Sequence, residues 1–182
     1  MTRWPFCAVV APFALALAAC QPGSFGDLAP VIGGAVERGP DSDSAVVRDR
    51  GVSATVTARW ASEASQSADI IYVNEQRAPV SIALPRLKLH HQRLGDAPLW
   101  AASDMTGVDR DDARTDNDEP PALYDLDKSP ATTRLVLKPG ERRTLNVGFT
   151  NFGGEERIRE GDRVTMTVPM GDRDVAIPFV AD

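Results

Sequence analysis

The sequence has few cysteines, lysines, histidines and aromatic residues, and each scarcity excludes a class of protein. Cysteine occurs only as Cys7 and Cys20, so a disulfide-rich scaffold is excluded. Histidine occurs only as the neighbours His90 and His91. Acidic residues outnumber basic ones by 26 to 20, which gives a net charge of -6 and only three lysines. Such a chain lacks the positive surface that phosphate backbones require, and no nucleic-acid partner is expected.

Long hydrophobic runs are also missing, because no apolar stretch reaches the roughly 18 residues typical of a membrane-spanning helix. The longest stretch follows Arg3 and extends from Trp4 to Ala19. A positive start, a short apolar centre and a small-residue end are the three regions of a secretory signal peptide. We therefore expect residues 1–19 to be a signal peptide.

The apolar stretch ends in Leu17-Ala18-Ala19-Cys20, which resembles the lipobox of bacterial lipoproteins. The resemblance implies that Cys20 is the lipid attachment site and the first residue of the mature protein. It also implies a lipid-anchored, envelope protein. Gln21 stands where aspartate would mark inner-membrane retention in the enterobacterial version of the family, which favours the outer membrane, with the domain facing the periplasm. Cys7 would be removed with the signal, so no intramolecular disulfide is expected.

Residues 20–51 are rich in glycine and proline, with a polar run at Asp41-Ser42-Asp43-Ser44. The few apolar residues follow no sustained period, apart from a possible short strand around Val46 and Val47. Glycine raises the entropic cost of order, and proline removes a ladder donor. We therefore predict a lipidated, flexible tether.

From Val52 onward the apolar residues recur with period two, as in half-buried strands. In one stretch Val80, Ile82 and Leu84 change phase at Pro85, and Leu87 then continues the apolar face. A bulge at the proline would account for the change. Turn residues separate most of the strands, and the last two form a predicted hairpin. The strands are expected around residues 52–60, 70–73, 80–89, 135–137, 145–149, 164–168 and 175–179.

Several short alternating strands without helical crossovers predict an all-β fold. We predict a single antiparallel β-sandwich of about seven strands over residues 52–182. The pattern is similar to immunoglobulin-like or fibronectin III-like domains of exported bacterial proteins, including Leu-x-Pro-Gly-Glu before a strand, here Leu137 to Glu141. The cysteine pair of antibody domains is absent.

No catalytic constellation is recognisable, and no cofactor-binding or metal site is predicted. His90 and His91, as neighbours on a strand, would point to opposite faces, and a solvated strand end is their expected place. The sequence contains no Gly-x-Ser-x-Gly elbow, phosphate-binding glycine loop or zinc-ligand cluster.

The unusual segment is an acidic insert at residues 104–127. Clustered carboxylates suit calcium, but Asp109, Asp111 and Asp112 lack the EF-hand spacing, so a solvated loop is expected. Trp100 and Tyr124 bracket the insert; they are expected to close the core, with glycan stacking as the alternative. The insert contains Asp104, Asp109, Asp111, Asp112, Asp116, Asp118, Glu119, Asp125 and Asp127.

These features together predict a non-enzymatic periplasmic lipoprotein that binds or positions another envelope protein or cell-wall component. A glycan- or calcium-binding module is the first alternative. A hydrolase that uses carboxylates of the acidic insert is the second.

Overall fold

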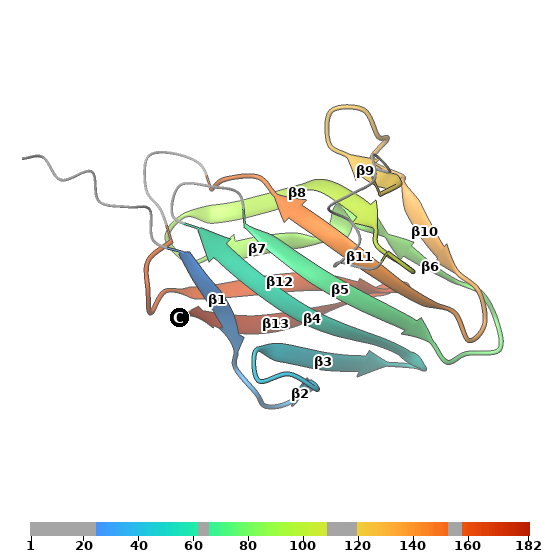
Figure 1. The fold of residues 1–182 in the computed structure, drawn as a ribbon, viewed down its shortest axis with the longest axis horizontal. Helices are drawn as coiled ribbons and strands as arrows, with labels where there is room; N and C mark the ends of the chain where they lie inside the picture. Colours follow the sequence, from blue (N-terminus) through green and yellow to red (C-terminus); the bar gives the residue numbers. More distant parts are fainter. Residues whose placement is uncertain (1–24, 62–65, 109–119, 153–157) are drawn as a thin grey trace, which may run out of the picture.

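The computed structural model describes residues 25–61, 66–108, 120–152 and 158–182, and the chain forms strands with almost no helix (Figure 1). The predicted all-β class is confirmed. The first seven strands are β1 (Phe25–Pro30), β2 (Val36–Arg38), β3 (Ser44–Asp49), β4 (Val52–Ala61), β5 (Ser67–Asn74), β6 (Val80–Ala83) and β7 (Lys88–His91). The others are β8 (Gly95–Asp104), β9 (Ala122–Asp125), β10 (Arg134–Leu137), β11 (Arg142–Phe149), β12 (Arg163–Met170) and β13 (Arg173–Ala181).

The predicted single β-sandwich of about seven strands is wrong, because the main sheet closes on itself as an eight-stranded barrel with extra strands. Its order is β1-β13-β12-β7-β8-β11-β5-β4, and β4 pairs with β1 to complete the circle. All pairings are antiparallel. Closure gives each barrel strand a hydrogen-bonded neighbour on both sides, whereas a sandwich leaves open edges.

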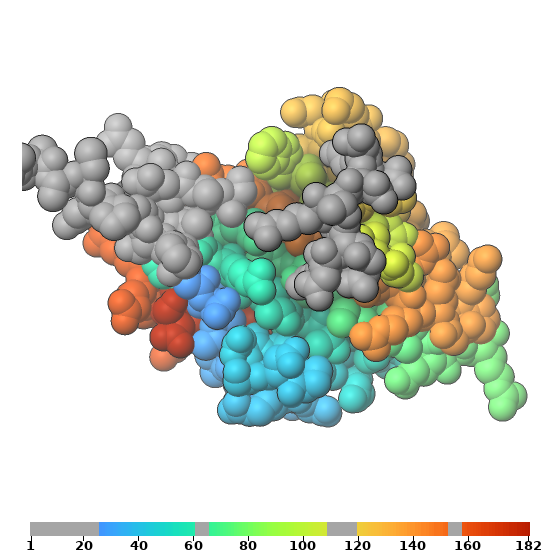
Figure 2. Space-filling view, viewed as in Figure 1, coloured from blue at the N-terminus to red at the C-terminus, as the bar shows by residue number. Residues whose placement is uncertain are grey.

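Strand β1 closes the barrel and lies in the segment that was predicted to be a tether. Leu28 pairs with Ala181 of β13 on one side and with Ala58 of β4 on the other. Its side chain is fully buried. Figure 2 shows the surface of this seam, where the blue residues of the N-terminal strands adjoin the red C-terminal strands. The prediction of a flexible tether over residues 20–51 is therefore wrong from Phe25 onward.

A glycine that suggested flexibility is in fact required by close packing. A Cβ atom at Gly26 would collide with the backbone oxygen of Asp182 and would lie 2.9 Å from Nε1 of Trp60. The amide of Asp182 donates to the carbonyl of Asp27 at 2.9 Å, and Trp60 Nε1 donates to the Asp182 oxygen at 3.2 Å. Gly26 thus lets the two ends of the described chain approach each other.

Three extra strands pair where neighbouring barrel strands do not run the full length of each other. β3 pairs with the half of β4 that β1 leaves unpaired, and β2 pairs with β3 on the other side. β9 pairs with β8, and β6 pairs with β10 in a separate two-stranded sheet. Figure 1 shows β6 and β10 together, away from the strand that closes the barrel.

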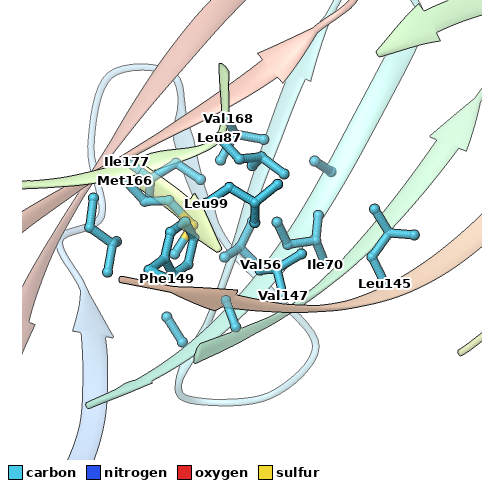
Figure 3. Close-up of a cluster of buried hydrophobic side chains, with 14 of the residues drawn as sticks. Val56, Ile70, Leu87, Leu99, Leu145, Val147, Phe149, Met166, Val168 and Ile177 are labelled. Atoms are coloured by element: carbon cyan, nitrogen blue, oxygen red, sulfur yellow. The ribbon is translucent and has the colours of Figure 1, made fainter. Parts of the chain in front are cut away.

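The core fills the barrel with inward side chains from alternate positions of the strands. Val56, Ile70, Leu99, Phe149 and Met166 come from five strands and converge in Figure 3. Each is 1% exposed or less. Burial of such side chains contributes about 1.5–3 kcal/mol each, so the barrel needs no disulfide to hold it together.

The predicted phase change at Pro85 is confirmed, because the apolar residues on both sides of it face the core. A short 3-10 turn, however, replaces the predicted bulge. Leu84–Arg86 form the turn η1, with Pro85 as its second residue, where a missing amide leaves no bond unmade. The amide of Leu87 donates to the carbonyl of Leu84 at 3.0 Å. Leu84 and Leu87 are both buried as a result.

The predicted signal peptide over residues 1–19 and Cys20 lie outside the described residues. Within the part of the chain that the structure describes, no helix has the length and apolar character needed to cross a membrane.

Candidate functional site

A pocket of about 500 Å³ lies where several segments meet beside the turn between β12 and β13. It is lined by the hairpin turn between β3 and β4, the β5–β6 loop, β6, η1, β10 and the β12–β13 turn. Three of its lining residues are Arg50, Arg86 and Arg134, and Asp172 is its one acidic lining residue among those described. We call this hollow the arginine pocket.

Arg50 enters the pocket from a strained turn. It has a φ of 45°, and Gly51 beside it has a φ of 77°, in the two-residue turn of the β3–β4 hairpin. Positive φ at both central positions favours Asn-Gly, not Arg-Gly. The carbonyl of Arg50 accepts a 2.7 Å hydrogen bond from Nε2 of Gln76, and its guanidinium lies 3.6 Å from the carboxylate of Asp172. The strained conformation is therefore fixed by contacts on both sides of the residue.

Arg86 is placed by η1, because the 3-10 turn directs the residue after Pro85 away from the core. Its Nη2 lies 2.8 Å from Oδ2 of Asp174, and its Nε donates to the same oxygen at 3.2 Å. Nη2 also reaches the backbone carbonyl of Asp172 at 3.5 Å. This two-pronged contact orients the guanidinium beside the β12–β13 turn.

Arg134 reaches the pocket from β10, and its side chain makes no hydrogen bond or ion pair within the described part of the chain. It is exposed, whereas its neighbour Leu135 is buried. An arginine without an acidic partner keeps its five N–H donors available to a ligand. Arg134 is thus the arginine of the pocket whose charge is most available to a ligand.

The electrostatics of the pocket oppose those of the whole protein. Three guanidinium groups stand against the carboxylates of Asp172 and Asp174, in a chain whose net charge is -6. Arginine stays charged at any physiological pH and matches carboxylate and phosphate oxygens in pairs. The arrangement therefore favours an anionic ligand.

Asn74 holds the loop that forms one wall of the pocket. Its buried Nδ2 lies within hydrogen-bond distance of three carbonyl oxygens, those of Ala78 at 2.9 Å, Leu137 at 3.0 Å and Lys138 at 3.1 Å. Its Oδ1 accepts a 2.9 Å bond from the amide of Gln76. One side chain thus joins the end of β5 to the β5–β6 loop and to the turn after β10.

A second, larger hollow of about 790 Å³ lies on the outer face of β4 and β5. Its charged lining residues are Asp41, Asp43, Asp69 and Arg59. Asp69 accepts a 2.9 Å bond from Asn146, and Arg59 lies 3.6 Å from Asp27. Its one cation, Arg59, is already paired, whereas the arginine pocket has Arg134 in addition to its paired arginines, so this hollow is the weaker candidate.

The two histidines do not lie together at a site. His90 is exposed, and its Nδ1 lies 2.6 Å from Asp96. His91 faces the opposite side, as predicted, but it is buried at 4% exposure, so the expectation that both are solvated is wrong for His91. Its Nδ1 accepts bonds from the amides of Arg93 at 3.0 Å and Leu94 at 3.1 Å, which closes the turn between β7 and β8.

Six of the nine acidic residues of the insert lie outside the described residues, since these omit 109–119. Asp104 pairs with Arg143, and Asp125 lies 2.8 Å from Lys128. Asp127 belongs to the turn after β9, where its amide bonds to Asp125 at 2.9 Å. Among the described residues no group of three metal-binding side chains comes together.

Of the two aromatic residues predicted to close the core, Tyr124 is buried, at 5% exposure, and Trp60 at the end of β4 is buried as well, at 4%. Trp100 is 48% exposed on β8, so the prediction that it closes the core is wrong. It faces outward because its neighbours Leu99 and Ala102 take the inward positions.

None of the residues that form the arginine pocket was predicted from the sequence. They stand far apart along the chain, and barrel closure brings them together. One local feature could have drawn attention to Arg50, because Arg50-Gly51 occupies a hairpin turn that favours Asn-Gly.

Comparison with known proteins gives no match among protein-family models, curated proteins or solved structures.

Proposed function

We propose that this protein is a non-enzymatic lipoprotein of the bacterial envelope that binds an anionic group of another envelope component in the arginine pocket. The convergence of Arg50, Arg86 and Arg134 on one hollow is the observation that carries the proposal. The guanidinium groups of the pocket would bind the anion through their positive charge and their directed N–H donors. The lipid on Cys20 holds the barrel at the outer membrane, facing the periplasm.

A binding role suits the pocket better than a catalytic one. Its described lining has no histidine, cysteine, lysine or tyrosine, the side chains that most often act as bases or nucleophiles. Its one carboxylate, Asp172, is occupied by Arg50. The pocket thus supports recognition of a carboxylate or phosphate group.

Titration calorimetry with succinate and with inorganic phosphate at low salt tests the binding role. At least one anion should bind the wild type, and Arg134→Gln should weaken the binding at least tenfold. Arg142→Gln is the matched control, because Arg142 is an exposed arginine on β11 outside the pocket. Equal loss in both variants would mean nonspecific attraction, and no binding of either anion would refute the proposal.

The anchoring role has its own test. Cys20→Ser removes the thiol that would form the thioether bond to diacylglycerol, so labelling of the protein with radioactive palmitate should disappear. Labelling that persists in the variant would contradict the anchor. The result does not depend on what the arginine pocket binds.

A glycan-binding module is the second candidate, and the exposure of Trp100 favours it. Its ring is 48% exposed on a strand, and the amide of the exposed Leu126 donates to its carbonyl at 2.8 Å. A flat aromatic surface can stack on a sugar ring. Binding of soluble cell-wall fragments that is lost in Trp100→Ala but kept in Arg134→Gln would favour this candidate.

A further inference from the structure

Strand β10 has one edge without a partner strand. It pairs only with β6, in register from Arg134 opposite Ala83 to Leu137 opposite Val80. The amide of Leu84 donates to the carbonyl of Thr133 at 3.3 Å, so Thr133 faces β6. Since successive residues of a strand alternate in direction, Arg134 and Val136 direct their backbone groups to the other side. In the described part of the chain no strand pairs with that side.

The same two residues combine an apolar and a cationic side chain on one face. Val136 is 54% exposed, more than any other large hydrophobic side chain among the described residues. Arg134 lies two positions earlier on the same face and lines the arginine pocket. Ser81, opposite Val136 on β6, also lines the pocket. The open edge and the pocket are therefore parts of one surface.

An occupant of this surface must satisfy three features at once. The open edge offers backbone hydrogen bonds, which an added β-strand would complete. Val136 offers an apolar contact, and the pocket offers guanidinium groups to carboxylates. Side chains on one face of an extended strand recur about every 6.8 Å, so acidic residues at alternate positions would all face the pocket side. An acidic extended peptide segment meets all three requirements, whereas a free phosphate or a sugar meets only one.

We propose that the free edge of β10 receives an extended, acidic segment of a partner protein, whose carboxylates enter the arginine pocket. The inference rests on the proposed function and names its ligand class. The strand of the partner would extend the β6–β10 sheet to three strands. Arg134 would bind a carboxylate on the pocket side, while its backbone and that of Val136 would pair with the partner.

Fluorescence anisotropy of the full chain with three labelled peptides tests the proposal. The first peptide alternates glutamate and valine over eight residues, the second replaces each glutamate by glutamine, and the third is the first peptide with every backbone amide N-methylated. The first should bind, and the other two should bind at least tenfold more weakly, because one lacks carboxylates and the other lacks backbone donors. Equal binding of the N-methylated peptide would overturn strand addition.

Variants of the protein test the same surface from the other side. Arg134→Gln and Val136→Pro should each weaken binding of the first peptide at least tenfold, whereas Arg142→Gln should not. A proline at Val136 removes an amide that faces away from β6, so the β6–β10 ladder stays intact. Thermal unfolding checks that the variant folds, and a wild type that fails to distinguish the three peptides refutes the proposal whatever the variant does.

Further outcomes separate the inference from the proposed function. If succinate or phosphate binds at the pocket but no peptide binds, the proposed function holds and the inference about β10 is overturned. Arg134 would then only protect the edge of β10 from pairing with other strands. If neither small anions nor peptides bind, both fail. If sedimentation shows a dimer that Val136→Pro abolishes, the edge receives a second copy of this chain, and the partner proposed here is wrong.

Discussion

The guanidinium of Arg50 lies 3.6 Å from the carboxylate of Asp172. This ion pair joins the turns of two hairpins, β3–β4 and β12–β13, across 122 positions of the sequence. Both side chains are more than half exposed, at 57% and 76%. Exposed ion pairs of this kind contribute about 0–1 kcal/mol. The pair therefore does not by itself explain an arginine in a left-handed turn.

Arg50→Asn is expected to stabilise the fold and to impair anion binding. Asparagine suits a φ of 45° far better than arginine, and relief of such strain is worth about 1 kcal/mol or more. The lost ion pair offsets part of this gain, so the free energy of unfolding should stay equal or rise by up to about 1 kcal/mol. Urea unfolding measures the stability, and calorimetry with succinate measures the binding. A variant that is less stable than the wild type would show that Arg50 is held for structural reasons.

Gly26→Ala is expected to destabilise the barrel because the new Cβ would meet the backbone of Asp182. The seam between β1 and the end of β13 must shift to make room, at a cost of about 1–3 kcal/mol. Gly148→Ala is the matched control, since nothing lies within 4 Å of a Cβ at that position. Thermal unfolding of both variants makes the comparison. Equal stability of the two would mean that the seam does not carry the fold.

A shortened chain that starts at Val52 is expected to fail to fold cooperatively. It lacks β1, so β4 and β13 lose the strand that joins them. It also lacks the buried Leu28, Ala45 and Val47. A chain that starts at Gln21 keeps all three and should give a single cooperative unfolding transition in circular dichroism. Cooperative unfolding of residues 52–182 would show that the first three strands are dispensable.

The period-two pattern predicted most strands after Val52, but it could not predict how the sheet closes. Closure depends on β1, where Leu28 is the one side chain that the described core takes from the strand. Gly26 and Pro30 resemble tether residues in sequence, although Gly26 is there for close packing. A strand with one core residue shows no period, so only its partners β4 and β13 reveal it.

The arginine pocket could not be predicted for a related reason. Arg50, Arg86 and Arg134 belong to a turn, a 3-10 turn and a strand, and no spacing rule connects them. Their proximity follows from the closed barrel and from the β6–β10 sheet beside it. Trp100 was predicted to be buried because aromatic residues favour the core, yet the alternation along β8 turns it outward.

Asp104→Asn is expected to lower stability at neutral pH. The free energy of unfolding of the variant should also fall less than that of the wild type as the pH is lowered. Burial opposes ionisation of Asp104, but bonds from Thr106 and the charge of Arg143 outweigh it and hold the pKa of the carboxyl below its ordinary value. A lowered pKa in the folded state stabilises the protein above the unfolded pKa of about 3.9, and this stabilisation is lost as the pH falls through the folded pKa.

The loss at pH 7 should be about 1.5–3 kcal/mol, the usual contribution of hydrogen bonds to a charged group. Urea unfolding from pH 7 down to pH 2.5 measures the gap between wild type and variant. The gap should narrow once the pH falls below about 4. A gap that stays constant over the whole range would mean that the ionised form of Asp104 contributes nothing.

Tyr72→Phe is expected to stabilise the protein. The side chain is fully buried on β5, and its hydroxyl makes no hydrogen bond among the described residues. An unpaired buried hydroxyl costs about 1–3 kcal/mol, and phenylalanine fills the same space without it. The free energy of unfolding at pH 7 should therefore rise by about 1 kcal/mol or more, measured by urea unfolding. Tyr124→Phe is the matched control and should not raise stability, because the Tyr124 hydroxyl is not among the buried polar atoms without a hydrogen bond in the described part of the chain.

The same substitution has a signature at alkaline pH. Burial, and then the nearby charge of Asp174, raise the pKa of Tyr72 above its ordinary value. Tyrosine in the unfolded chain ionises near pH 10, so the wild type loses stability above that pH while the buried phenol stays protonated. Tyr72→Phe removes this loss, and its advantage over the wild type should grow as the pH rises past about 10. A substitution that instead costs more than 1 kcal/mol at pH 7 would mean that the hydroxyl is paired, for example with a buried water, and that the barrel interior holds a polar contact.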